Sequence, residues 1–247
     1  MKVRFPVDFW WGGATSGPQN EGRFHKPHVN VFDYHYDTKP EDFFRYVGPD
    51  VASDFYHLYE SDIALFKDLG FNSLRTSIQW TRLIDDLEEG SLNLEGVAYY
   101  NRVIDALLAA GIRPIINLHH FDLPIELYER YGGWESKHVV ELFVKFARRA
   151  FECFGDRVTD WMTFNEPMVV VEGQYLYGFH YPMLVDGKKA VQVAYNLQLA
   201  SAKAIQAYRQ INQNPAGRVT IALNLLAKLK KIWQQHILPT YLSTASS

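Results

Sequence analysis

The sequence has little cysteine and no long apolar run, and each shortage excludes a class of protein. The single cysteine, Cys153, cannot form an internal disulfide. It lies at helical spacing among Phe151 and Phe154, so we interpret it as a core residue in a reducing compartment rather than a catalytic thiol. No apolar run approaches the roughly 20 residues that a membrane-spanning helix needs. The start lacks the features of a signal peptide, so we expect a cytoplasmic protein with no membrane partner.

The chain also lacks a strong charge of either sign. Its 247 residues include 25 Lys and Arg and 28 Asp and Glu, which gives a net charge of −3. This balance offers no general attraction to phosphate backbones, so we expect no nucleic-acid partner. The hydrophobic content of 47% supports a sizeable core and excludes an intrinsically disordered chain.

Short apolar runs alternate with stretches of helical periodicity. The runs are brief and rich in aromatic or β-branched residues, which predicts buried strands. The predicted strands are Phe9–Gly13, Ser73–Ile78, Arg113–Leu118, Trp161–Phe164 and Val219–Asn224. Four helices are predicted between them, at about 53–70, 93–111, 139–155 and 191–211, the first capped by Ser53. The alternation predicts an α/β fold with a parallel sheet or barrel.

The spacing of the strands bears on how much of a barrel is present. A complete eight-unit barrel typically takes about 250 residues, but eight units as widely spaced as these would need roughly 400. We therefore interpret residues 1–225 as about half a barrel, with the first five strands and four helices, and residues 226–247 as an off-pattern tail.

An amide and a carboxylate follow the predicted fourth strand. Asn165 and Glu166 lie at its C-terminal end, and Pro167, which has no N–H, helps to end the strand pairing. In a parallel barrel that end is the active-site face. A carboxyl among aromatic side chains is desolvated and prepared to donate a proton near neutral pH. The open alternative is that both side chains only satisfy loop backbone groups.

Two histidines end the predicted third strand. Adjacent residues on a strand point to opposite faces, so one histidine reaches the mouth of the barrel, and we choose His120. A metal-dependent hydrolase would join His120 to Asp122 and a third ligand. No His-x-His or His-Glu-x-x-His spacing is present, so we expect neither a metal nor a cofactor, and metal analysis would test this alternative.

Three further side chains are candidates for a site. Gln19 follows a glycine-rich stretch that fits neither the P-loop nor the dinucleotide fingerprint, and it offers a donor and acceptors to vicinal hydroxyls. Arg75 is a cation in an otherwise buried strand and requires a carboxylate partner, either structural or catalytic. Trp134 offers a flat apolar face that suits a sugar ring, or else packs in the core.

Five motifs in this order resemble the N-terminal half of glycoside hydrolase family 1, which comprises β-glucosidases and 6-phospho-β-glucosidases. The motifs are FWWGGATSGPQNEG, LRTSIQWTRL, NLHHFDLP, GGW and WMTFNEP. The resemblance extends from about Phe5 to about Leu225. It implies a (β/α)8 TIM barrel that hydrolyses β-glycosides with retention of configuration.

The resemblance also implies roles for single residues. Glu166 matches the acid/base, Asn165 the contact to the sugar 2-hydroxyl, and Arg75 the residue that pairs with the nucleophile. Contacts to the sugar at the non-reducing end are implied for Gln19, His120 and Trp134.

The stretches Ser16–Gln19 and Glu21–Lys26 resemble those of bacterial 6-phospho-β-glucosidases. The implied substrate is therefore a 6-phosphorylated disaccharide, which suits a cytoplasmic chain. The alternative is an unphosphorylated β-glucoside.

A retaining glycosidase needs two carboxyl groups about 5 Å apart. The family supplies its nucleophile from a Thr-Glu-Asn-Gly type motif, which this sequence does not contain. We therefore interpret the chain as truncated, with a possible complementing C-terminal half. The alternative is a non-catalytic sugar-binding or assembly half that works only with a partner chain.

We predict that the chain alone is marginally stable or aggregates and has no substantial glycosidase activity. Half a barrel leaves strand edges unpaired and interior side chains facing water. The measurement is hydrolysis of a chromogenic 6-phospho-β-glucoside by the purified chain. Turnover that is lost in a Glu166→Gln variant would contradict this expectation.

Overall fold

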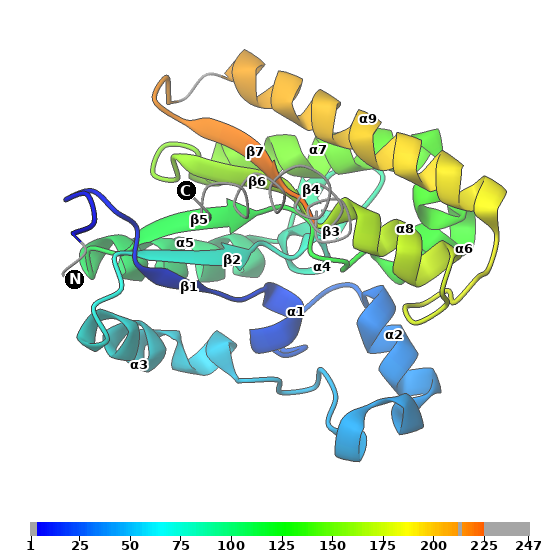
Figure 1. Ribbon diagram of the computed structural model, residues 1–247, viewed down its shortest axis with the longest axis horizontal. Coiled ribbons are helices and arrows are strands. Elements are labelled where there is room, and N and C mark those ends of the chain that lie inside the picture. Colours follow the sequence, from blue (N-terminus) through cyan, green and yellow to red (C-terminus); the bar gives the residue numbers. More distant parts are fainter. Residues whose placement is uncertain (1–3, 212–213, 225–247) are drawn as a thin grey trace, which may run out of the picture.

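Five parallel strands form the central sheet of the structure, a computed structural model that describes residues 4–211 and 214–224 (Figure 1). Their order in the sheet is β1-β2-β5-β6-β7, which is also their order along the chain. The strands are β1 Gly12–Ala14, β2 Ser73–Ser77, β5 Arg113–Asn117, β6 Asp160–Asn165 and β7 Arg218–Ala222. This arrangement confirms the predicted α/β fold of the TIM-barrel type with five strands. The tail predicted at 226–247 lies outside the described residues.

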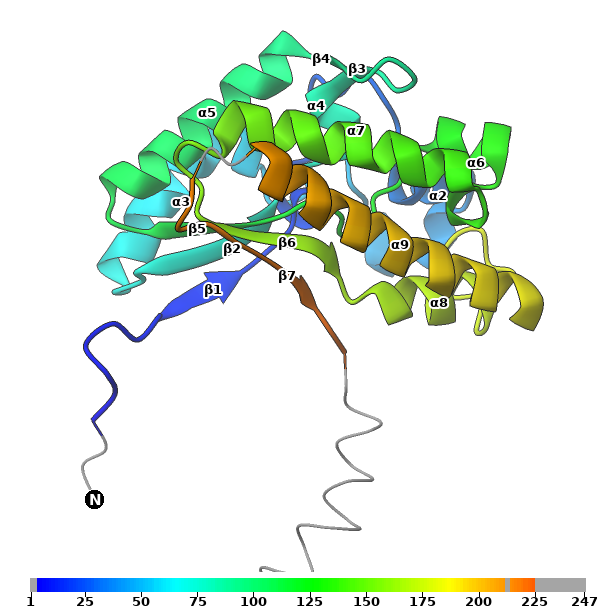
Figure 2. The same cartoon turned by 90° about the horizontal axis from the view of Figure 1, so that it is seen from above.

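Four long helices cover one face of the sheet, and Figure 2 shows no helix layer on the opposite face of the part that is described. They are α3 Phe55–Asp68, α5 Leu94–Ala109, α7 Lys137–Phe154 and α9 Gly187–Ile211, as the periodicity predicted. In the described ranges no helix is long and apolar enough to cross a membrane.

Shorter elements gather mainly at the ends of the strands. In Figure 1 the strands point toward the side on which α1, α2 and α8 lie. These elements are α1 Gly17–Asn20, α2 Val31–Thr38, η1 Pro40–Asp42, η2 Phe44–Tyr46, α4 Trp80–Leu83, β3 Ile84–Asp86, β4 Ser91–Leu92, α6 Ile125–Tyr131, η3 Gly133–Glu135 and α8 Pro167–Tyr175. The strands β3 and β4 form a separate antiparallel pair.

Helix α7 shows how the sequence builds the core. The hydroxyl of Ser136 accepts a hydrogen bond from the His138 N–H and caps the first turn, and the helix ends before Gly155. Its apolar face is fully buried, and Phe146 stacks on Trp80 with ring centroids 5.3 Å apart. Aromatic packing therefore joins α7 to the segment that follows β2.

Two predicted boundaries are wrong. The first strand begins at Gly12, not at Phe9, because Phe9 and Trp11 form a partly exposed aromatic cluster with Phe5, with centroids 4.7 Å apart. Helix α3 begins after Asp54, which has a left-handed backbone and makes no side-chain cap, so Ser53 does not cap the helix.

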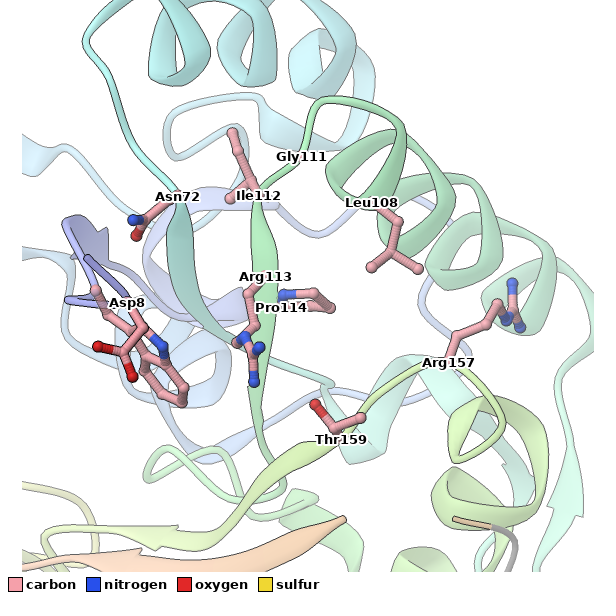
Figure 3. A pocket seen from close by; sticks show the side chains of 10 residues that line it. Asp8, Asn72, Leu108, Gly111, Ile112, Arg113, Pro114, Arg157 and Thr159 are labelled. Atoms are coloured by element: carbon pink, nitrogen blue, oxygen red, sulfur yellow. The ribbon is translucent and has the colours of Figure 1, made fainter. Parts of the chain in front are cut away.

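A hollow of about 510 Å³ lies at the N-terminal ends of β2, β5 and β6 (Figure 3). Two of its side chains are arginines that already have carboxylate partners. Arg113 pairs with Asp160 at 3.1 Å, and Arg157 pairs with Asp105 at 2.6 Å. This end of a barrel serves stability rather than catalysis, so the candidate site is expected at the opposite end.

Gly96 allows close contact between α5 and α4, which generates a testable prediction. A Cβ at Gly96 would lie 2.2 Å from the carbonyl oxygen of Arg82. We expect Gly96→Ala to lower the free energy of unfolding by about 1–3 kcal/mol, because the helices must move apart. Gly187→Ala is the matched control, since no heavy atom lies within 4 Å of an added Cβ there. Urea unfolding measures both, and equal midpoints would disprove the role of Gly96.

Candidate active site

Three predicted residues meet at the C-terminal end of β6, which Arg75 reaches from the middle of β2. The Nη1 atom of Arg75 donates to Oδ1 of Asn165 at 2.9 Å. The Nδ2 atom of Asn165 donates in turn to Oε2 of Glu166 at 3.4 Å. Strand β5 lies between β2 and β6, so the Arg75 side chain reaches across it. The structure therefore links Arg75, Asn165 and Glu166 by contacts.

The backbone fixes the position of Glu166. Its φ of 45° lies in the left-handed region, directly before Pro167 and helix α8. Its N–H donates to the carbonyl oxygen of Ala222 at 2.8 Å, which ties it to the end of β7. The side chain is half-buried, which is less enclosure than its aromatic strand predicted.

Arg75 has an amide partner where the sequence predicted a carboxylate. Within residues 4–211 and 214–224, no carboxylate lies within ion-pair distance of its guanidinium. The Nε atom is buried and has no hydrogen-bond partner. The guanidinium thus retains a buried donor that a further acceptor can satisfy.

Gln19 and His120 line the same cavity of about 520 Å³. Gln19 lies in the short helix α1, where Ser16 Oγ donates to Gln19 Oε1 at 2.7 Å. The Gly17 N–H donates to Ser77 Oγ at 2.8 Å, and this bond attaches α1 to the end of β2. These contacts hold the Gln19 amide at the cavity wall.

The two adjacent histidines face different surroundings. His119 packs edge-on against Trp134, with centroids 5.1 Å apart, and its burial lowers the pKa of the ring to about 3. His120 lines the cavity, and its pKa is lowered to about 4 by burial and by the charge of Arg75. Both rings are therefore neutral at neutral pH, and His120 is the one that meets the cavity.

Trp134 does not join the other candidate residues. It is 0% exposed and packs against Phe143 and Phe164, with centroids 5.5 and 5.4 Å apart. The expectation that it contacts a sugar is corrected, because it lies in the core, as the alternative reading held. Phe121 lines the cavity beside His120 instead, and its φ of 69° breaks the strand alternation. Its place in the same motif as His120 was the available signal.

A buried polar network behind Gln19 was not predicted. Glu21 Oε2 accepts from Arg82 Nε and from Gln79 Nε2, each at 2.8 Å. Tyr100 donates its hydroxyl to the same oxygen at 3.1 Å. Arg82 is 1% exposed, and its guanidinium lies 4.6 Å from the ring centroid of Tyr56. The network anchors the segment that follows Gln19.

The carboxyl group of Asp122 accepts a hydrogen bond from the backbone. Its Oδ1 accepts from the His120 N–H at 2.8 Å, and the residue is 1% exposed. In the described part of the chain, no three His, Cys, Asp or Glu side chains are grouped so that they could hold a metal ion.

Asp122 gives a pH prediction. Its Oδ2 is buried without a partner, and burial raises the pKa of the carboxyl to about 7. Between about pH 4 and 7 the unfolded form ionises while the folded form keeps its proton, so stability falls as pH rises. Asp122→Asn keeps a side-chain oxygen that accepts from the His120 N–H, and it removes this loss of stability with rising pH.

We expect the stability of Asp122→Asn relative to wild type to increase by about 2 kcal/mol between about pH 5 and pH 8. Urea unfolding at both pH values measures it. The lowered pKa values of His119 and His120 make both proteins less stable in acid and cancel in the comparison. A stability difference between variant and wild type that does not change with pH would contradict the raised pKa of Asp122.

Comparison with known proteins gives consistent matches. The family model of glycosyl hydrolase family 1 matches residues 1–232. The chain is 48% identical to 6-phospho-beta-glucosidase GmuD of Bacillus subtilis and 37% identical to Beta-glucosidase A of Acetivibrio thermocellus. Each match covers 91% of this chain and 48% or 49% of the relative.

Solved structures agree with these matches. An aphid myrosinase is 34% identical with a TM-score of 0.83, over 89% of this chain and 48% of that chain. The AHE enzyme of Alicyclobacillus herbarius is 34% identical with a TM-score of 0.83, over 90% and 49%. The chain thus spans about half the length of the relatives it matches. It belongs to glycosyl hydrolase family 1.

Proposed function

We propose that this chain supplies the acid/base side of a retaining β-glycoside hydrolase. The observation that carries the proposal is the series of contacts from Arg75 through Asn165 to Glu166 at the C-terminal end of β6. Catalytic groups of TIM barrels lie at this end of the strands. Membership of glycosyl hydrolase family 1 supports the same reaction class.

Glu166 is the proposed acid/base. As a carboxylic acid it protonates the glycosidic oxygen while the bond to the anomeric carbon breaks, and as a carboxylate it then takes a proton from the attacking water. Its left-handed backbone and its hydrogen bond to Ala222 hold the carboxyl at the strand ends.

Asn165 is the proposed contact to the sugar 2-hydroxyl. A guanidinium only donates hydrogen bonds, so the bond from Arg75 requires Oδ1 of Asn165 to face it. The Nδ2 group then faces Glu166 and the substrate. Arg75 therefore fixes which way the amide points.

Arg75 is also the proposed partner of the nucleophile. Its buried Nε without a partner suits a second carboxylate, which retention requires about 5 Å from the first. Since no carboxylate among the described residues pairs with Arg75, the proposal includes a complementing C-terminal half that brings the nucleophile.

The proposed substrate is a 6-phospho-β-glucoside. Support comes from the 48% identity to a 6-phospho-beta-glucosidase, against 37% to Beta-glucosidase A. The amide of Gln19 and the neutral imidazole of His120 lie at one cavity wall and are the proposed contacts to the sugar ring. A phosphorylated sugar is charged and does not cross membranes, so we also propose a cytoplasmic location.

The test complements the 247-residue chain with the C-terminal half of the Bacillus subtilis relative. We expect the complemented protein to hydrolyse 4-nitrophenyl 6-phospho-β-glucoside faster than its unphosphorylated analogue. Glu166→Gln should lower kcat by about 10²–10⁴-fold, because proton transfer is lost. Glu172→Gln, on the same helix α8, is the matched control and should retain activity.

Full activity of the Glu166→Gln variant would overturn the assignment of the acid/base. Preference for the unphosphorylated analogue would keep the glycosidase and replace the substrate. A chain that binds sugar but remains inactive with its complement would favour the non-catalytic alternative.

A further inference from the structure

Gln79 is a fully buried amide that the proposed reaction does not use. It lies just after β2 and is 0% exposed. Its backbone N–H donates to the Tyr100 hydroxyl at 2.8 Å. Its carbonyl oxygen accepts from the N–H groups of Arg82 and Leu83 at 3.1 and 3.0 Å. The backbone of Gln79 is therefore held on both sides, and the side chain projects from a fixed point.

The orientation of the Gln79 amide is set by its partners. Nε2 donates to Oε2 of Glu21 at 2.8 Å. Oε1 accepts from Nζ of Lys26 at 3.4 Å and from Nδ2 of Asn30 at 3.3 Å. A carboxylate only accepts hydrogen bonds, and an ammonium only donates them. The amide therefore cannot turn over without facing donor with donor and acceptor with acceptor.

Gln79 contacts the short helix α1 at both of its ends. At the first residue, a Cβ on Gly17 would lie 2.4 Å from Cγ of Gln79, so the backbone of α1 rests directly on this side chain. At the other end, the N–H of Glu21 donates to the carbonyl oxygen of Gly17 at 2.9 Å, while its carboxylate accepts from Gln79. Gln19 lies between these two points in a helix of only 4 residues. Since so short a helix has little stability of its own, its position depends on these contacts.

A second set of contacts leads from Gln79 to the loop that carries His120. Asn30 donates its Nδ2 to Gln79 and forms an antiparallel bridge with Pro124, which belongs to the same loop as His120. Backbone hydrogen bonds of 3.0 and 2.9 Å flank this bridge. One amide therefore connects the two segments that bring Gln19 and His120 to the cavity.

We propose that Gln79 is a positioning residue, which fixes the place of α1 so that Gln19 meets the substrate. This rests on the proposed function, because Gln19 is taken to contact the sugar ring. Gln79 is not among the residues that line the cavity, so it acts through α1 and not by touching the substrate. A purely structural role would lower stability alone. A positioning role makes the effect of Gln79 on sugar binding depend on the presence of Gln19.

The first experiment observes α1 directly, by hydrogen–deuterium exchange of the full 247-residue chain. Gln79→Met keeps the length of the side chain and removes its hydrogen bonds. We expect the amides of α1 to exchange about tenfold faster than in wild type, because the helix loses its bond at Glu21. Helix α7 is the internal reference for a global loss of stability. Gln198→Met is the matched control, since Gln198 is exposed on α9.

A second variant displaces α1 from the other side. Gly17→Ala places a methyl group against Cγ of Gln79 and leaves every hydrogen-bonding side chain of the network in place. We expect the same rise in the exchange of α1. Gly187→Ala is its control, because no heavy atom lies within 4 Å of an added Cβ there. If Gln79→Met fails to fold by circular dichroism, Gly17→Ala decides the question.

Kinetics of the complemented protein then distinguish positioning from stability. With 4-nitrophenyl 6-phospho-β-glucoside, Gln79→Met should raise KM about 3–10-fold and change kcat by less than about twofold, because the loss is in the sugar contact of Gln19. In a Gln19→Ala background, the same substitution should change KM by less than about twofold, because the contact that Gln79 positions is already absent.

The outcomes separate this inference from the proposed function. If α1 exchanges at the wild-type rate in both Gln79→Met and Gly17→Ala, the positioning role is overturned. It is equally overturned if Gln79→Met raises KM by the same factor with and without Gln19. If the complemented wild-type protein is inactive, the proposed function is overturned, and the exchange of α1 alone decides whether Gln79 holds the helix.

Discussion

A hydrogen bond between two strands that are not neighbours holds the candidate site together. Adjacent strands lie about 4.8 Å apart, so β2 and β6 are separated by roughly twice that distance with β5 between them. The Arg75 side chain spans this gap and meets Asn165 at 2.9 Å. By strand register, Arg75 is level with Ile115 of β5 and Asp160 of β6, so Asn165 lies five residues further along β6. The contact therefore depends on the length of the Arg75 side chain, which extends toward the C-terminal end of β6.

The segment after β1 depends on buried charge in a similar way. Glu21 pairs with Arg82, and Lys26 pairs with Asp33, and these side chains are 1–3% exposed. Removing ions from water is costly, and such pairs persist only where further hydrogen bonds satisfy them, as Gln79 does here. Loss of one partner would leave a buried charge, so the segment is fixed in one conformation. This segment lines the cavity with Gln19, which precedes the two ion pairs, and with Phe32, Phe43 and Val47, which lie beside or after Asp33 in the chain.

The sequence predicted the sheet because buried parallel strands are short apolar runs, and it predicted the long helices because their apolar faces repeat regularly. It placed β1 too early because Phe9 and Trp11 look like strand residues. The backbone instead enters the sheet at Gly12, where a Cβ would lie 1.9 Å from the carbonyl oxygen of Ser73. The apolar pattern does not report so close an approach between backbones. The pair β3–β4 and helix α2 were missed because they are too short for a clear period.

For the site, strand-end position made Arg75, Asn165 and Glu166 candidates but left structural roles open, and only the resemblance to glycoside hydrolase family 1 favoured catalytic ones. The local pattern likewise left a sugar contact and a core position open for Trp134, because its burial depends on the packing of α7 and β6 over it. The protonation states of buried groups also depend on tertiary packing, which the local pattern does not show. His120 remains neutral above about pH 4, so it faces the cavity as an uncharged group. Asp122 behind it has a pKa of about 7 and accepts the His120 N–H. Charge therefore changes near neutral pH behind the cavity surface, at Asp122, while His120 at that surface keeps one protonation state.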